Sequence, residues 1–349
     1  FNKGESMQSR RMMILRAVVE DYIRSHEPVG SASLAKNHKL GVSSATIRND
    51  MSLLEEEGYL IQPHTSAGRI PTEKGYRYFV DGLAALIPLS NAQRRGIRTF
   101  LSGSVSLQDT LQRSARLLAS ITGQVALVAS PALSKSKVKR IEIVQVSSST
   151  LLVVVITDAG GVAQHMIQAS NINPDDLLHL VNMVNESCVG ASLLDASKRV
   201  YLLANRKDLA SALQVISQLA NALEDMHNGE HSYDLYMAGA SQLAHRQNIG
   251  DFASLFDALE EQAVIMRLMT SLSEEANDCA SGVSVAIGSE THTPGLLNAS
   301  VVTSAYGYNS DSDSAFIGSI GPTHMDYAAT MTAVKAVAKY LNTFIYENK

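Results

Sequence analysis

The sequence predicts a multidomain α+β protein that begins with a winged helix-turn-helix. At 349 residues the chain is too long for one core, so two or three domains are expected. Its first 60 residues contain three helical patterns separated by turn signals, and short strand-like segments follow them. From residue 124, β-branched runs alternate with helical patterns, which is typical of antiparallel sheets flanked by helices.

One stretch near the N-terminus has the features of a DNA-recognition helix. Ser43 is the expected N-cap, because its hydroxyl can accept a proton from a first-turn amide. Ile47, Met51 and Leu54 fall on one apolar face. Gly58 can adopt the left-handed conformation that ends a helix.

The residues around this helix predict the rest of a winged domain. Two further helices are expected upstream, at 11–26 and from residue 31, and Leu40-Gly41-Val42 supplies the tight turn into the recognition helix. Downstream, 59–61 and 69–70 can pair as strands, and the loop between them would be the wing. Helix, helix, turn, helix and wing together indicate a winged helix-turn-helix.

The candidate DNA contacts lie in the first half of the helix and in the wing. Arg48 can donate two hydrogen bonds to guanine, and Asn49 can pair with adenine or remain a helix-surface spectator. His64 either contacts DNA or stabilises its turn, and Lys74 and Arg77 either clamp phosphates or are solvated. The full set of predicted contacts is Ser43, Ser44, Ala45, Thr46, Arg48, Asn49, His64, Thr65, Ser66, Gly68 and Arg69.

Charge determines how the helix must face DNA. Three carboxylates, Glu55 to Glu57, end the helix and would repel phosphates, so its N-terminal half must enter the groove. In the wing, Gly68 would allow a close backbone approach to DNA and Arg69 would supply positive charge. The whole chain has a net charge of −5, so DNA binding must depend on local placement of charge, and a dimer would double the contacts.

Beyond the wing, a coarse pattern of elements follows. A helix is expected to start at Thr72, and residues 86–92 form a linker. The expected elements after the linker are a helical tract at 92–121, strands at 124–129, 138–146, 151–157 and 161–168, a helix at 174–189, a strand at 200–203, a helix at 209–226, a strand at 233–237, a helix at 252–272, strands at 283–287, 300–308 and 315–320, and a helix at 327–346.

Several segments resemble a known family. ATIRNDMSLLEEEGYL and PHTSAGRIPTEKGYRYFVD closely resemble HrcA, a family of bacterial heat-inducible transcription repressors. Further matches are LLASITGQVALVAS, LVVVITDAGGV, YMAGASQLA, LFDALEEQ, VAIGSE and IGPTHMDY, so the resemblance covers essentially all of the chain. One departure is His324, where the family usually has arginine.

The resemblance implies a domain division and a function. It implies a winged helix-turn-helix at 1–86 and a GAF-like domain at 93–190 and 276–349, interrupted by an inserted dimerisation domain at 191–275. It also implies a cytoplasmic homodimer that binds double-stranded DNA at an inverted repeat, the CIRCE element, ahead of the groE and dnaK operons. In the family, the GroEL chaperonin keeps the repressor active and heat shock relieves repression.

Composition agrees with a cytoplasmic regulator. The start FNKGES lacks the apolar core of a signal peptide, and no run of about 18 apolar residues predicts a membrane span. Cys188 and Cys279 lie far apart without a CxxC motif, which favours a reducing compartment and argues against structural zinc. No cofactor or metal is expected.

An enzyme and a ligand-responsive repressor are the two alternatives to this function. An enzyme would have to use His165, His292, His324 or Asp326, but no nucleophile motif, HExxH motif or P-loop accompanies them, so no catalytic residue is expected. The alternative function is a small-molecule-responsive winged-helix repressor, in which the GAF-like domain would be the ligand sensor.

Overall fold

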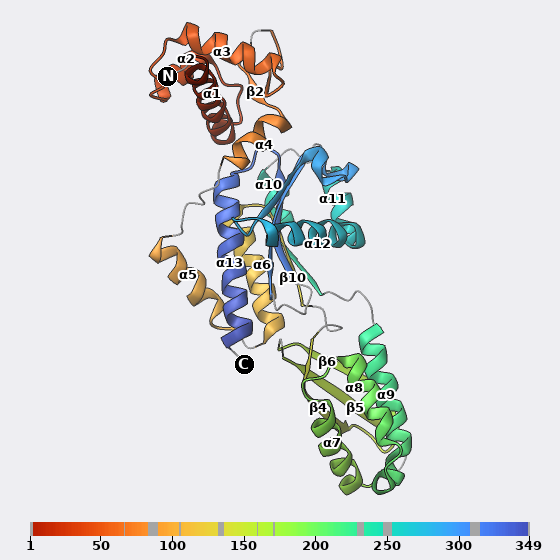
Figure 1. Ribbon diagram of the computed structural model, residues 1–349. Coiled ribbons are helices and arrows are strands. Elements are labelled where there is room, and N and C mark those ends of the chain that lie inside the picture. Colours follow the sequence, from red (N-terminus) through yellow and green to blue (C-terminus); the bar gives the residue numbers. More distant parts are fainter. Residues whose placement is uncertain are drawn as a thin grey trace.

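The computed structural model arranges the chain as three units in a row (Figure 1). The structure describes residues 3–65, 67–82, 90–104, 106–131, 136–158, 160–169, 172–228, 234–246, 253–307 and 315–347. We call residues 3–81 the N-terminal unit, 90–131 with 234–347 the central unit, and 136–228 the distal unit. The central unit lies between the other two.

The N-terminal unit consists of helices and one two-stranded sheet. Its elements are α1 (Lys3–Ser25), α2 (Ser31–Asn37), α3 (Ser44–Glu56), β1 (Leu60–Ile61), β2 (Ile70–Pro71) and α4 (Glu73–Asp81). The helices and strands predicted here are therefore present. Ser43 caps α3 by accepting a hydrogen bond from the Thr46 amide, and Gly58 follows the helix with a φ of +79°, as predicted.

The central unit has three layers around a five-stranded antiparallel sheet. In this sheet the strand order is β7-β3-β10-β9-β8, and α6 and α13 cover one face while α10, α11 and α12 cover the other. Both faces of the central strands are therefore buried. The elements are α5 (Asn91–Leu101), α6 (Leu107–Thr122), β3 (Val125–Ala129), β7 (Leu235–Ala238), α10 (Ala240–Arg246), α11 (Ala253–Glu260), α12 (Gln262–Asp278), β8 (Ser284–Ile287), β9 (Ala299–Tyr306), β10 (Ala315–Pro322) and α13 (Tyr327–Glu347), with short 3₁₀ helices η4 (Gly288–Thr291) and η5 (Pro294–Leu296).

The distal unit has its own sheet and its own hydrophobic core. Three antiparallel strands in the order β4-β5-β6 bury alternate residues against the helices. Its elements are β4 (Val138–Gln145), β5 (Thr150–Thr157), β6 (Val162–Gln168), α7 (Pro174–Cys188), α8 (Leu193–Leu203), η2 (Lys207–Ala212) and α9 (Leu213–Asn228). The apolar residues of this core form a cluster separate from those of the other two units.

The structure differs from the expected domain boundaries. The boundary expected at residue 190 lies inside the distal unit, whose core joins β4–β6 to α8 and α9, and the one expected at residue 275 lies inside α12. The segment inserted into the central unit is 136–228, because β7 returns to pair with β3. The strand expected at 200–203 is also wrong, since this segment completes α8, in which Val200 is buried on the apolar face.

Candidate nucleic-acid interface

The outer face of α3 is polar and exposed. Ile47, Met51 and Leu54 are buried against the unit's core, which leaves Arg48 and Asn49 on the opposite, solvent-facing side. The Arg48 side chain forms no ion pair with any described residue. An arginine and an asparagine on the open face of a helix are the side chains best suited to the edges of guanine and adenine.

The start of α3 is organised by hydroxyl groups. The Ser43 hydroxyl lies 3.0 Å from that of Thr46, and the Ser44 hydroxyl lies 3.2 Å from that of Ser31 at the start of α2. The two helix starts are thereby held side by side. Ser43 and Ala45 are exposed, whereas Ser44 and Thr46 are half-buried. The four predicted contacts at this end therefore differ in how far solvent reaches their side chains.

A buried ion pair orients α3 on α1, and sequence reasoning missed it. Asp50 is 1% exposed, and its carboxylate accepts hydrogen bonds of 2.8 and 3.1 Å from the Arg10 guanidinium. In the helical pattern Asp50 lies next to Met51 on the edge of the apolar face. That position was the available signal, because an acidic residue there requires a partner.

The wing is held against α3 by Arg69. Its Nε donates to Glu55 at 2.9 Å and its Nη2 donates to the Ser52 hydroxyl at 2.9 Å, so the guanidinium is engaged within the chain. The Arg69 side chain thereby joins the wing to α3, and its predicted contact with DNA stays a prediction. Gly68 allows a close backbone approach to Val29 of the same chain, because a Cβ at this position would lie 2.4 Å from the Val29 carbonyl oxygen.

The tip of the wing is exposed. His64 and Thr65 are solvent-facing, and the Ala67 amide donates to the His64 carbonyl at 2.9 Å, which forms a turn. The Gln62 side chain donates to the carbonyls of Thr65 and Ala67 at 3.1 and 2.9 Å. Ser66, also a predicted contact, lies outside the described residues. Gln62 is therefore the residue that shapes the tip.

Neither basic residue of α4 belongs to this surface. Lys74 lies over the Tyr59 ring, 4.2 Å from its centroid, and donates to the Glu57 carbonyl at 2.8 Å. Arg77 points to the central unit and pairs with Glu290. Both were ambiguous in the sequence, and their contacts make them structural.

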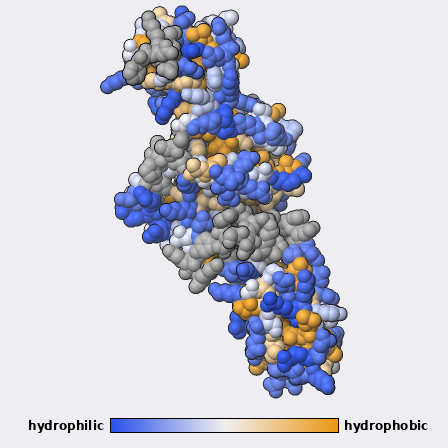
Figure 2. Space-filling view, in the orientation of Figure 1, coloured by the Kyte–Doolittle hydropathy of each residue, from blue (hydrophilic) through white to orange (hydrophobic). Residues whose placement is uncertain are grey.

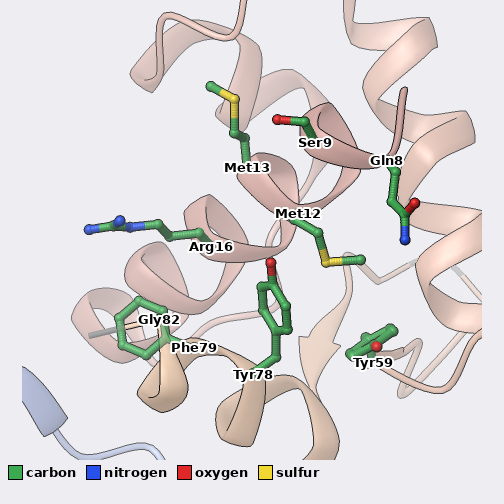
Figure 3. A pocket seen from close by; sticks show the side chains of 9 residues that line it. All are labelled: Gln8, Ser9, Met12, Met13, Arg16, Tyr59, Tyr78, Phe79 and Gly82. Atoms are coloured by element: carbon green, nitrogen blue, oxygen red, sulfur yellow. The ribbon is translucent and has the colours of Figure 1, made fainter. Parts of the chain in front are cut away.

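A groove lies on another side of the N-terminal unit (Figure 3). It has a volume of about 600 Å³ between α1 and α4, and Tyr78 projects from α4 toward α1. Tyr59 packs edge-on to Tyr78 at a centroid distance of 6.0 Å. Among the described residues, no predicted DNA contact lines this groove.

The four residues considered for catalysis do not form one site. His165 is on β6 in the distal unit, whereas His292 lies beside η4 in the central unit. His324 packs against His26, which directly follows α1, and Asp326 accepts a hydrogen bond of 3.0 Å from the Ala329 amide. Asp326 therefore caps the start of α13.

Comparison with known proteins identifies the family. Residues 108–331 match the family described as "HrcA protein C terminal domain". Over 97% of its length the chain is 59% identical to the "Heat-inducible transcription repressor HrcA" of Bifidobacterium adolescentis, of which 97% is covered. The chain belongs to the HrcA family. The HrcA of Kineococcus radiotolerans is 44% identical over 96% of the chain and 98% of that protein.

A solved structure shares the fold of this chain. It is a crystal structure of a hypothetical protein at 2.2 Å resolution, with a TM-score of 0.66 and 23% identity, covering 97% of this chain and 99% of that one. Within the part of the chain that the structure describes, no helix is long and apolar enough to cross a membrane. The family is one of transcription repressors, in agreement with the resemblance seen in the sequence.

Proposed function

We propose that this chain represses transcription by binding operator DNA through its N-terminal unit, which acts as a winged helix-turn-helix. In this proposal α3 enters the major groove and the β1–β2 wing contacts the neighbouring backbone. The observation that carries the proposal is the exposed face of α3, where Arg48 and Asn49 lie opposite a fully buried apolar face.

The charges of the unit support one orientation on DNA. Glu56 and Glu57 at the end of α3 are exposed, and they would meet phosphates if the helix lay along its full length in the groove. Its N-terminal end carries the capped first turn, which favours a phosphate through the helix dipole. The helix is therefore proposed to enter by its first two turns.

Arg48→Ala tests the base contact. Loss of a bidentate contact to guanine is expected to lower operator affinity by about 1–3 kcal/mol and to relax sequence preference at one position. Gel-shift titration at fixed salt, with operator and random duplexes, measures both effects. The control is Arg16→Ala, which removes an equal charge from α1, where Arg16 pairs only with Glu20 among the described residues. Unchanged operator binding by Arg48→Ala would remove Arg48 from the interface.

We further propose that two copies pair through the distal unit. On the outer face of its sheet, Leu152 of β5 lies between Val144 and Met166, which are 51% and 57% exposed. The same face carries Val154 and, at its other end, Val162, and Figure 2 shows hydrophobic patches on this unit. An apolar sheet face open to solvent favours a protein partner. A second copy satisfies the two-fold symmetry of an inverted repeat.

Val154→Arg tests the dimer contact. A charge at the centre of this face is expected to give a monomer in light scattering and to weaken binding to a full inverted repeat by at least about tenfold, because two linked contacts give avidity. Leu178→Arg, at an exposed residue of α7, is the control and should leave the dimer intact. A Val154→Arg variant that remains dimeric would place the dimer contact on another surface.

The resemblance to the HrcA family supports a proposal for the operator and for a protein partner. We propose the CIRCE inverted repeat ahead of groE and dnaK as the operator and the GroEL chaperonin as the partner that maintains the active repressor. A gel shift with a CIRCE probe across temperature, with and without chaperonin, tests both. Chaperonin should raise the bound fraction at each temperature. Binding that fades on warming but does not respond to chaperonin would favour direct sensing of heat.

A further inference from the structure

Two charged side chains of α4 contact one short loop of the central unit. The Nε of Arg77 donates to Glu290 at 2.9 Å, its Nη2 contacts the same carboxylate, and Nη2 also donates to the Val285 carbonyl at 2.7 Å. Glu73 accepts a hydrogen bond of 3.1 Å from the Ser289 amide and a second one from the Ser289 hydroxyl. The loop belongs to the segment VAIGSE, which matches the family but has no part in the proposed DNA contacts or in the proposed dimer contact.

The backbone of this loop is shaped to accept Glu73. Gly288 has a φ of +51°, and a Cβ there would lie 2.1 Å from the Glu73 carboxylate oxygen. Burial raises the pKa of Glu290, but hydrogen bonds from Arg77 and from the Ile287 amide outweigh it, so its pKa is lowered. The carboxylate is therefore charged at neutral pH and remains paired with Arg77. The four residues Glu73, Arg77, Ser289 and Glu290 are called the junction below.

Two further contacts join the same units at other points. The rings of His26 and His324 lie 4.5 Å apart, between the end of α1 and the loop before α13. Tyr76 and Tyr327 are buried with ring centroids 5.9 Å apart. A body held at three separated points has a fixed orientation, so α3 has a set direction relative to the central unit.

The junction is better suited to fixing geometry than to adding stability. The Arg77 and Glu290 side chains retain 30% and 37% of their exposure, and ion pairs that exposed contribute little to stability. A planar guanidinium that bonds a carboxylate and a carbonyl at once is directional. The pair of Arg77 and Glu290 therefore fixes the angle at which α4 meets the central sheet.

We propose that the junction residues are positioning residues that set the separation and direction of the two recognition helices in the dimer. This inference rests on the proposed function, in which two copies bind one inverted repeat. Half-sites on DNA are read at a fixed helical spacing, since each added base pair rotates a half-site by about 35°. A rigid junction would therefore make affinity depend steeply on the spacer between half-sites.

The test measures affinity against spacer length for the full chain. Wild type should lose at least tenfold in affinity when the spacer changes by two base pairs. Arg77→Ala and Glu290→Gln should each flatten this loss to less than threefold while binding of a single half-site remains as in wild type. The two variants change net charge in opposite directions, so a shared effect cannot arise from attraction to phosphates. Ser289→Ala should flatten the profile without changing charge.

The matched control is Arg113→Ala, which removes an arginine paired with Asp109 on α6 and should keep the wild-type profile. Junction variants with the wild-type profile, or a wild type that tolerates every spacer equally, would overturn the inference. Small-angle scattering without DNA provides a separate readout: the junction variants should show a larger radius of gyration, and an unchanged curve would also overturn it. If wild type binds no inverted repeat, the proposed function fails, and scattering still decides the role of the junction.

Discussion

At the scale of single residues, a polar side chain beside an apolar stripe can be as buried as its neighbours. Asp50 is 1% exposed because Arg10, 40 residues earlier, covers it. A local pattern predicts the stripe of Ile47, Met51 and Leu54 but contains no information about which distant residue approaches its edge. Sequence spacing therefore indicates that Asp50 needs a partner, but it does not identify Arg10 as that partner.

The two members of this pair should respond unequally to truncation. Arg10→Ala leaves a carboxylate buried without a partner and is expected to cost about 3 kcal/mol of stability. Asp50→Ala leaves a guanidinium whose side chain, 27% exposed, can reach water, so its cost should be smaller, about 1 kcal/mol. Urea unfolding of the full chain measures both. Equal costs would mean that Asp50 gains solvent when Arg10 is absent.

At the scale of elements, features specified by neighbouring residues were predictable and features specified by distant pairing were not. The cap at Ser43 and the stop at Gly58 depend on a few adjacent residues, and both are present. The domain boundaries depend on the pairing of Ala126 with Ala238, across more than a hundred residues, and were misplaced. In the same way, the sequence gives the positive charge of Arg69 but does not identify Glu55 on α3 as its partner.

The wing provides a test that separates positioning by Arg69 from direct contact with phosphates. Glu55→Gln removes a negative charge, so it would tighten DNA binding if Arg69 were thereby released to contact phosphate. If Arg69 positions the wing through Glu55, the same change should weaken operator binding by about 1 kcal/mol. Glu56→Gln, at the exposed neighbouring residue, removes the same charge and serves as the control. Gel shifts at two salt concentrations distinguish the cases.

At the scale of the whole molecule, the chain has two independent parts. One hydrophobic cluster runs from α1 through α4 into α6, α13 and one face of the central sheet, so the N-terminal and central units share a core. Among the residues that the structure describes, the distal core contains only members of its own unit. Cooperative unfolding follows shared cores, and a multidomain chain with separate ones is not expected to unfold in two states.

Heat should therefore separate DNA binding from dimer formation. Leu118→Ala, in the shared core, and Leu180→Ala, in the distal core, each create a cavity at a fully buried position and should cost about 2–5 kcal/mol. Calorimetry is expected to show at least two transitions. Leu118→Ala should lower one by about 2–4 °C per kcal/mol, and Leu180→Ala should lower the other, which belongs to the smaller distal unit, by about 4–8 °C per kcal/mol. In gel shifts at rising temperature, binding to a single half-site should be lost at the transition that Leu118→Ala lowers and not at the other one. If both variants moved a single transition together, the distal unit would be coupled to the shared core, and a heat-induced loss of repression would require the entire chain to unfold.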